Sequence, residues 1–236
     1  MTLAITAAIL VIIGTAGYRT HLLPLLPSFL LLGVGLLGSV ISAILYVVRI
    51  VLMLLRNQPS RMGVVAAGLV LALVVLAVPV SVVMSARRGA SGLPAIHDIT
   101  TDTDDPPVFV DVLPLRADAP NTTEYGGAEI AAQQRQAYPD MRSVVLPAPP
   151  GEAFDDALVA VNGMGWKIAG ANRGDGRIEA TDSTFWFGFK DDVVIRLRPS
   201  VGGTKVDVRS VSRVGGGDVG ANAKRIRTYL QRLQTR

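Results

Sequence analysis

Three long apolar stretches near the amino terminus constrain the fold more than any other feature of this sequence. They span residues 2–18, 27–48 and 62–84, and none contains an acidic residue or a lysine. A helix needs about 20 mainly apolar residues to cross a hydrocarbon core roughly 30 Å thick, where its backbone groups must bond to one another. The sequence therefore predicts three transmembrane helices, with the lipid bilayer as the first partner.

The first stretch is short enough to resemble a signal peptide. It lacks the basic start and the small-residue cleavage site that such peptides carry, so we expect a retained helix. Ionisable groups at membrane depth mark most transporters and proton relays, and their scarcity in these stretches favours an anchor over a small transporter.

Charge divides the chain near Arg87 and Arg88. All 19 acidic residues lie from Asp98 onward, whereas the first 88 residues hold six arginines and no lysine. Subtracting these six from the 23 basic residues leaves 17 basic residues against 19 acidic ones, a net charge of about −2 for the rest of the chain. A nucleic-acid-binding protein concentrates basic charge on its folded domain, so we expect no nucleic-acid partner.

The orientation of the helices depends on the arginines that flank them. Arg49, Arg56 and Arg61 follow the second stretch, and Arg19, Arg87 and Arg88 lie on the other side, which is a tie under the positive-inside rule. We favour a cytoplasmic amino terminus and a cytoplasmic loop from Arg56 to Arg61. The expected location is a multi-pass protein of the inner (plasma) membrane with its soluble domain on the periplasmic, extracytoplasmic side.

The soluble part divides into two segments. Residues 89–142 are rich in Gly, Pro, Asp and Thr, which indicates an extended linker and peripheral segment with one short helix at 129–137 and an edge strand near 108–113. Residues 143–236 alternate strand and helix patterns in the order β, α, β, β, β, β, α. Roughly 140 residues are enough for one hydrophobic core.

Register predicts which side chains form that core, because apolar residues must share one face of the sheet. A turn at Gly202-Gly203 sets Leu197 opposite Val208, and a loop at 190–192 sets Phe187 opposite Ile195. We therefore predict an α+β fold, a curved antiparallel sheet packed by two or three helices. Its expected core residues are Trp166, Ile168, Phe185, Phe187, Phe189, Ile195, Leu197, Val206 and Val208.

The same register gathers charge on the other face of the sheet. It places Trp186 across from Arg196, and Arg196 across from Arg209, and facing like charges destabilise a sheet unless something neutralises them. In one interpretation the face is solvated, Asp207 and another carboxylate satisfy the arginines, and Trp186 forms a cation–π pair with an arginine. In the other the face binds an anionic ligand such as a lipid phosphate. The candidate ligand-binding residues are then Trp186, Arg196, Arg209 and Arg213.

Metal chemistry has one candidate segment. Residues 97–105 hold one imidazole and four carboxylates, and hard cations prefer oxygen ligands, so His97, Asp98 and Asp102 are candidate metal ligands. The spacing lacks the glycine and the final glutamate of a calcium loop, and Asp and Thr also build turns before Pro106-Pro107. The sequence contains no cysteine, and we predict no cofactor and no assigned catalytic residue.

Long strings in the second half of the sequence resemble the domain of unknown function 1499 family in its membrane-anchored bacterial branch. These include His97-Asp98-Ile99-Thr100-Thr101-Asp102, Tyr138-Pro139-Asp140, Met164-Gly165-Trp166, the run from Ala180 to Asp192, and the run from Val206 to Arg213. The resemblance covers about residues 94–233. It implies a membrane-anchored or exported protein, which agrees with a domain outside the cytoplasm, and it brings no established activity.

The function that we predict is therefore a non-enzymatic, membrane-anchored envelope domain. It would serve as a binding or accessory module for an envelope protein or an anionic, lipid-like amphiphile. The alternative is a metal-assisted hydrolase that uses His97, Asp98 and Asp102.

Overall fold

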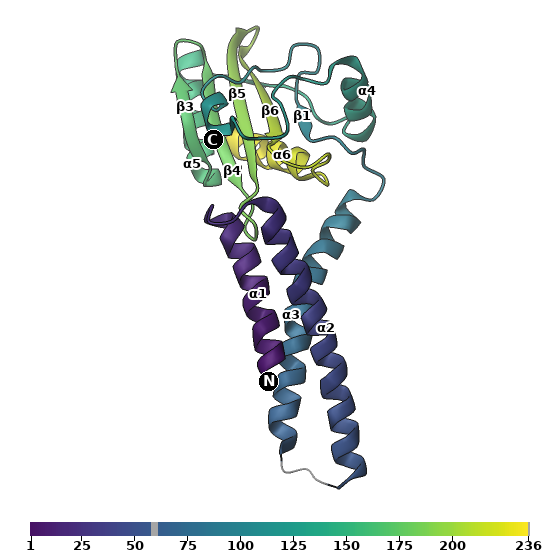
Figure 1. The fold of residues 1–236 in the computed structure, drawn as a ribbon. Helices are drawn as coiled ribbons and strands as arrows, with labels where there is room; N and C mark the ends of the chain where they lie inside the picture. The colour runs from purple at the N-terminus through teal and green to yellow at the C-terminus, as the bar shows by residue number, and fades with distance from the viewer. Residues whose placement is uncertain (58–60, 236) are drawn as a thin grey trace. The chain divides into compact units, whose positions relative to one another are not determined.

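The computed structural model describes residues 1–57 and 61–235, and its chain divides into two compact units (Figure 1). The first unit contains residues 1–88 together with Phe185–Gly188. The second contains Gly89–Thr184 and Phe189–Arg236. The expected cytoplasmic loop between Arg56 and Arg61 lies in part outside the described residues, at positions 58–60.

Three helices make up the first unit: α1 (Thr2–Arg19), α2 (Leu25–Leu55) and α3 (Met62–Ala90). Each is long and apolar enough to cross a membrane. At about 1.5 Å per residue, α1 measures about 27 Å, and α2 and α3 both exceed the roughly 30 Å of a hydrocarbon core. The structure extends α2 seven residues beyond the predicted end, so Arg49 lies inside the helix. Because α2 is longer than a bilayer requires, Arg49 can still reach the interface.

Small residues bring α1 and α2 close together. A Cβ atom on Gly14 would lie 2.7 Å from the carbonyl oxygen of Ser28, and one on Gly35 would lie 2.8 Å from that of Ala7. The backbone of α3 comes close to the other two helices at fewer positions. Its first half is fixed by Gly68, where a Cβ atom would collide with the ring of Tyr46.

The second unit is the predicted α+β domain, and its core carries an antiparallel sheet in the order β1-β6-β5-β4-β3, with β2 also paired to β6. Its elements are β1 (Asp98–Thr100), the 3₁₀ helix η2 (Leu113–Arg116), α4 (Gly127–Ala137), β2 (Val144–Leu146), α5 (Pro150–Met164), β3 (Lys167–Asn172), β4 (Arg177–Ser183), β5 (Lys190–Ser200), β6 (Gly203–Ser212) and α6 (Ala221–Gln234). The predicted order from β2 to α6 is confirmed.

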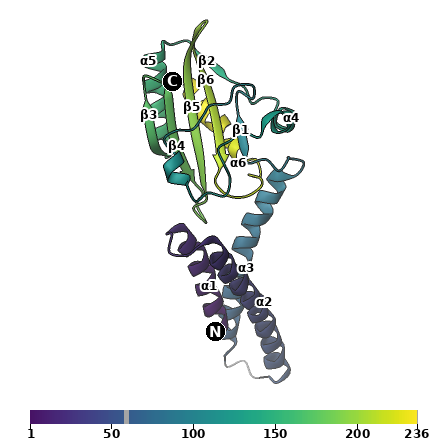
Figure 2. The same ribbon diagram turned by 45° about the horizontal axis from the view of Figure 1, so that its top comes forward.

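Helices α5 and α6 cover one face of the sheet and enclose the core (Figures 1 and 2). Both helices contribute buried apolar residues, and Trp166 stacks on Tyr229 of α6 with ring centres 5.4 Å apart. Of the predicted core residues, the structure buries Trp166, Ile195, Leu197, Val206 and Val208 in this cluster and packs Ile168 against it.

The predicted register between β5 and β6 is wrong by two residues. Leu197 faces Val206, and Arg196 faces Asp207, because the hairpin turns between Ser200 and Gly203 rather than at Gly202-Gly203. A shift of two residues keeps every side chain on its own face of a strand. The core assignment of these two strands therefore survived an incorrect register.

The predicted strand through Phe189 is also wrong. Strand β4 ends at Ser183, and residues 190–192, which we expected to form the loop, begin β5 and pair with residues 181–183. Phe185, Phe187 and Phe189 therefore lie in the connection between strands and not in the core. Their places are taken by Ile178, Ala180 and Val193, which are buried there.

Candidate functional site

The face of the sheet opposite α5 and α6 carries most of the domain's buried charge. Strands β5 and β6 alternate apolar and charged residues, so a period of two points Asp192 and Arg196 of β5 to the same side as Asp207 and Arg209 of β6. Asp192, Asp207 and Arg209 are almost completely buried. Burial of ionised groups is costly unless partners satisfy them.

The cover over this face is residues 101–126, which we call the strap (Figure 2). We expected an edge strand near 108–113, but the strap crosses the sheet and forms η2 instead. Phe109 and Val112 of the strap pack on Val194 and Val211 of the sheet. The buried carboxylate of Glu179 accepts hydrogen bonds from the backbone amides of Val110 (2.8 Å) and Val112 (3.0 Å).

Arg209 lies at the centre of the charged face and is 2% exposed. Its guanidinium donates two hydrogen bonds to Asp98, at 2.9 and 2.7 Å. It also donates to the carbonyl oxygens of Pro107 (3.0 Å) and Thr123 (2.7 Å). The ring of Tyr125 lies 5.4 Å away, and burial raises the pKa of Tyr125 to about 12. Each guanidinium nitrogen of Arg209 therefore donates within the chain.

Arg196 and Arg213 are also engaged by carboxylates of the same chain. Arg196 donates to Asp207 at 2.9 and 3.1 Å and to the backbone oxygen of Asp105 at 2.7 Å. Arg213 donates to both oxygens of Asp192, at 2.8 and 2.9 Å, and Arg116 of the strap donates to the same carboxylate at 3.0 Å. The structure thus favours neutralisation by carboxylates, one of the two interpretations that the sequence left open.

Trp186, the fourth predicted ligand-binding residue, does not lie on this face. The register places Arg177 and Asp207 beside Arg196, and Trp186 belongs to the connection between β4 and β5. The reason is that the strand ends at Ser183 instead of continuing through the aromatic run. The four predicted residues therefore do not form one site.

The connection has its own local structure. Thr184 and Phe189 close its neck, because the amide of Thr184 donates to the carbonyl of Phe189 and the amide of Phe189 to the Thr184 hydroxyl, both at 2.9 Å. Gly188 has a φ of +68°, a conformation that favours glycine. We call Phe185, Trp186 and Phe187 the aromatic tip. Phe185 and Trp186 meet edge to face with ring centres 5.4 Å apart.

The aromatic tip belongs to the unit of apolar helices. The ring of Phe187 lies 5.4 Å from that of Phe29 in α2. Arg19, at the end of α1, donates a hydrogen bond to the carbonyl oxygen of Phe185 and lies 5.8 Å from the centre of its ring.

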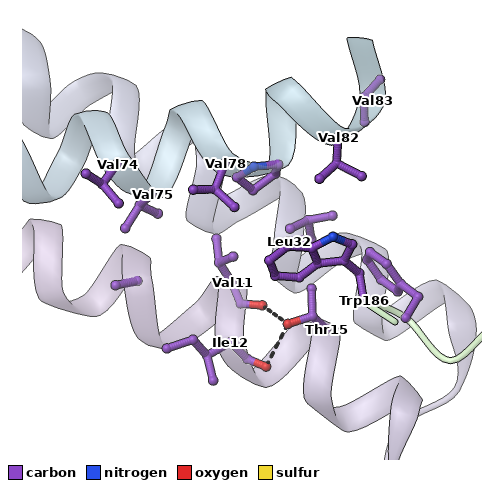
Figure 3. A pocket seen from close by; sticks show the side chains of 13 residues that line it. Val11, Ile12, Thr15, Leu32, Val74, Val75, Val78, Val82, Val83 and Trp186 are labelled. Atoms are coloured by element: carbon purple, nitrogen blue, oxygen red, sulfur yellow. Dashed lines mark hydrogen bonds between the residues drawn. The ribbon is translucent and has the colours of Figure 1, made fainter. Parts of the chain in front are cut away.

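An apolar cavity of about 280 Å³ lies within this unit. Figure 3 shows Trp186 among side chains of the three helices. The one hydroxyl in the lining, on Thr15, donates back to the carbonyl oxygens of Val11 (2.9 Å) and Ile12 (3.1 Å). The cavity is lined by Ala8, Val11, Ile12, Thr15, Leu32, Val74, Val75, Val78, Pro79, Val82, Val83, Trp186 and Phe187.

The candidate metal ligands are placed in separate interactions. The backbone oxygen of His97 accepts hydrogen bonds from the Ser212 amide and the Asn222 side chain. Asp98 gives both carboxylate oxygens to Arg209, and Asp102 accepts from Lys205 at 2.7 Å. Within residues 1–57 and 61–235, no three histidine or acidic side chains come together as a metal ion would require.

Asp102 borders an open polar pocket of about 460 Å³, which Lys205, Arg135 and several residues between 138 and 143 also line. Burial raises the pKa of Asp102, but the hydrogen bond from Lys205 and those from the amides of Asp105 and Asp104 outweigh it, so the pKa is lowered. Arg135 pairs with Asp104 at 3.2 Å. Asp102 and Asp104 thus have cationic partners within the chain, and Arg142, also in the lining, donates to the carbonyl oxygen of Pro139.

Comparison with known families identifies the sheet domain. The model of a family described as a protein of unknown function (DUF1499) matches residues 98–233, which is more than half of the chain. The chain belongs to the DUF1499 family. The match confirms the resemblance seen in the sequence. No curated protein matches the chain.

The DUF1499 match begins at Asp98, the partner of Arg209, and ends within α6. It therefore contains the strap, the sheet and the aromatic tip, and the three apolar helices precede it.

The interactions of the buried residues Glu179, Asp192 and Arg225 could not be predicted from the sequence. Arg225 of α6 forms ion pairs with Asp182 of β4 and Asp191 of β5, which are more than 30 positions away in the sequence.

One signal for the aromatic tip was present in the sequence. Phe185, Trp186 and Phe187 are consecutive, so a strand would send at least one of them to the charged face. An aromatic run that violates the period of two, followed by a glycine, is typical of a loop.

Proposed function

We propose that this DUF1499 protein is a multi-pass protein of the inner (plasma) membrane whose sheet domain is a non-enzymatic binding module on the extracytoplasmic side. The module contacts membrane amphiphiles through the aromatic tip, not through the arginines of the sheet. The observation that carries the proposal is the grouping of the aromatic tip with the apolar helices.

The charge distribution supports the choice of surface. Arg196, Arg209 and Arg213 are satisfied by Asp207, Asp98 and Asp192, so an anion at that face would have to displace internal partners. Removing one partner of a buried ion pair costs about 3–5 kcal/mol, which opposes such an exchange. The aromatic tip carries no such cost.

The chemistry of the aromatic tip suits a membrane interface. Phe185 is 77% exposed and Trp186 is 47% exposed, although both are large and apolar. Tryptophan is enriched where lipid headgroups meet the hydrocarbon, because its ring is apolar and its N–H needs a polar partner. Arg19 beside the tip is a cation suited to the same layer.

The interior of the sheet domain supports a binding role over the hydrolase alternative. A metal-assisted hydrolase needs carboxylate oxygens that are free to bind the ion, but Asp98 gives both of its oxygens to Arg209. The extracytoplasmic side is inferred from the exported members that the family resemblance implies, since the flanking arginines do not decide it.

Tryptophan fluorescence tests the position of the aromatic tip. The chain has two tryptophans, Trp166 in the core and Trp186 in the tip. We expect the full chain in vesicles of brominated phospholipid to fluoresce less than in vesicles of the ordinary lipid, because bromine quenches an indole that it touches.

The variant Trp186→Phe supplies the matched control, since it leaves only Trp166, which is 5% exposed. Its emission should be the same in both lipids. Equal emission of the unsubstituted chain in both lipids would contradict the proposed contact.

A further inference from the structure

We propose that the apolar cavity of the helical unit binds one acyl chain of a bilayer phospholipid. This inference rests on the proposed function and names the ligand class of the aromatic tip.

The lining excludes water as the natural occupant. A buried water needs two to four polar partners, and apolar cavities stay dry. The hydroxyl of Thr15 already donates to Val11 and Ile12, and the other helical residues of the lining are aliphatic. The cavity therefore offers dispersion contacts and little else.

The helices themselves leave the space open. Helix α3 contacts α2 closely where Gly68 meets Tyr46. The residues of α3 that line the cavity come later in the helix, between Val74 and Val83. Pro79 lies inside this stretch, and a proline within a helix removes one backbone hydrogen bond and commonly bends it. Gly14 and Gly35 let the backbones of α1 and α2 pack closely, without Cβ atoms at these contacts.

The position of the cavity matches the hydrocarbon layer. Its α1 residues run from Ala8 to Thr15, within a helix whose full length is close to the thickness of that layer. An empty cavity forfeits dispersion energy on every wall. Acyl chains are the apolar groups present at this depth in a bilayer, and they are narrow and flexible enough to enter between helices.

The aromatic tip fits the same occupant. Trp186 and Phe187 close one side of the cavity. Arg19 lies beside Phe185 at the end of α1, where the headgroup of a lipid whose chain fills the cavity would be expected. A second copy of the chain or a protein segment would have to present an equally narrow apolar group, and both are outcomes of the test below.

Native mass spectrometry of the full chain released from phospholipid nanodiscs tests the inference. We expect one phospholipid to remain bound under activation that removes the surrounding lipids. Ala8→Phe places a ring in the cavity, and that adduct should be lost. Ala77→Phe makes the same change on an exposed position of α3 outside the lining, and the adduct should remain.

Val78→Phe fills the cavity from α3 and replaces Ala8→Phe if the latter does not fold, as judged by the emission of Trp166. Adducts that are equally abundant in the cavity-filling and control variants would overturn the inference, as would a dimer or a bound peptide in place of the lipid. If Trp186 is quenched by brominated lipid while no adduct depends on the cavity, the proposed function stands and this inference falls.

Discussion

Asp192 shows how single residues decide the use of the charged face. Its side chain is fully buried and accepts hydrogen bonds from Arg116, Arg213 and the hydroxyl of Thr181 (2.7 Å). Two cations meet one carboxylate at this point, so the carboxylate is what allows both arginines to be buried. The carboxylate of Asp192 is thus part of the interior of the domain.

We expect Asp192→Asn to lower the free energy of unfolding by about 3–5 kcal/mol, because it leaves two buried cations without their anion. Denaturant titration of the full chain in detergent measures this, with Trp186→Phe in the background so that the emission comes from Trp166. The matched control is Asp155→Asn, which breaks the exposed pair with Arg173 and should cost far less, because solvent screens surface ion pairs. Equal losses in the two variants would show that Asp192 does not stabilise the face.

At the scale of elements, the strap is the least regular part of the domain. It has one short 3₁₀ helix, and Arg196, Arg209 and Arg213 donate hydrogen bonds to its backbone carbonyl oxygens. Glu179 of β4 binds two of the strap's backbone amides from a fully buried position. From Val110 to Val112, Glu179 therefore accepts hydrogen bonds from two of the strap's amides, while Val112 also packs on Val194 and Val211.

We expect Glu179→Gln to loosen the strap, because an amide presents an N–H group where the carboxylate presented an acceptor. A buried donor without a partner costs about 1–3 kcal/mol, so the amides of Val110 and Val112 should exchange with solvent roughly tenfold or more faster. Hydrogen exchange read by mass spectrometry measures this.

Glu129→Gln is the control for this experiment, since Glu129 on α4 accepts a long, exposed hydrogen bond from Gln133 of the same helix. It should leave the exchange of the strap unchanged. Unaltered exchange in Glu179→Gln as well would mean that the two hydrogen bonds to Glu179 do not hold the strap.

The whole molecule combines helices that suit a bilayer with a domain that suits water. The absence of cysteine from the sequence permits a direct test of which side the domain occupies. Val201, in the turn between β5 and β6, is 98% exposed, and Asn57 follows α2. Three crossings from a cytoplasmic amino terminus place these two positions on opposite sides of the membrane.

We therefore expect Val201→Cys to react with a membrane-impermeant maleimide in intact spheroplasts, whereas Asn57→Cys should react only after the membrane is opened. The physical reason is that the charged reagent does not cross the hydrocarbon layer. The reverse pattern would contradict an extracytoplasmic domain, and equal labelling of both positions would contradict three crossings.

Local pattern by itself determined the three apolar helices, the order of elements from β2 to α6 and six of the nine predicted core residues, five buried and Ile168 packed against them. These features follow from hydrophobic runs and from periods of 2 and 3.6 residues, which depend on neighbours in the sequence. The face assignment of Leu197 and Val206 was correct even with the wrong register, since an error of two residues preserves the face.

Only the tertiary structure decided how the charges are used and where the aromatic run lies. Asp98 and Arg209 are 111 positions apart in the sequence, and the pairing of Arg116 with Asp192 requires a strap that folds back over the sheet. Such contacts depend on chain reversal and on which partner excludes water, and no local pattern contains that information. The prediction that Trp186 lies beside Arg196 was wrong for the same reason. Strand β4 ends at Ser183 because of its pairing with β5, which the local sequence does not show.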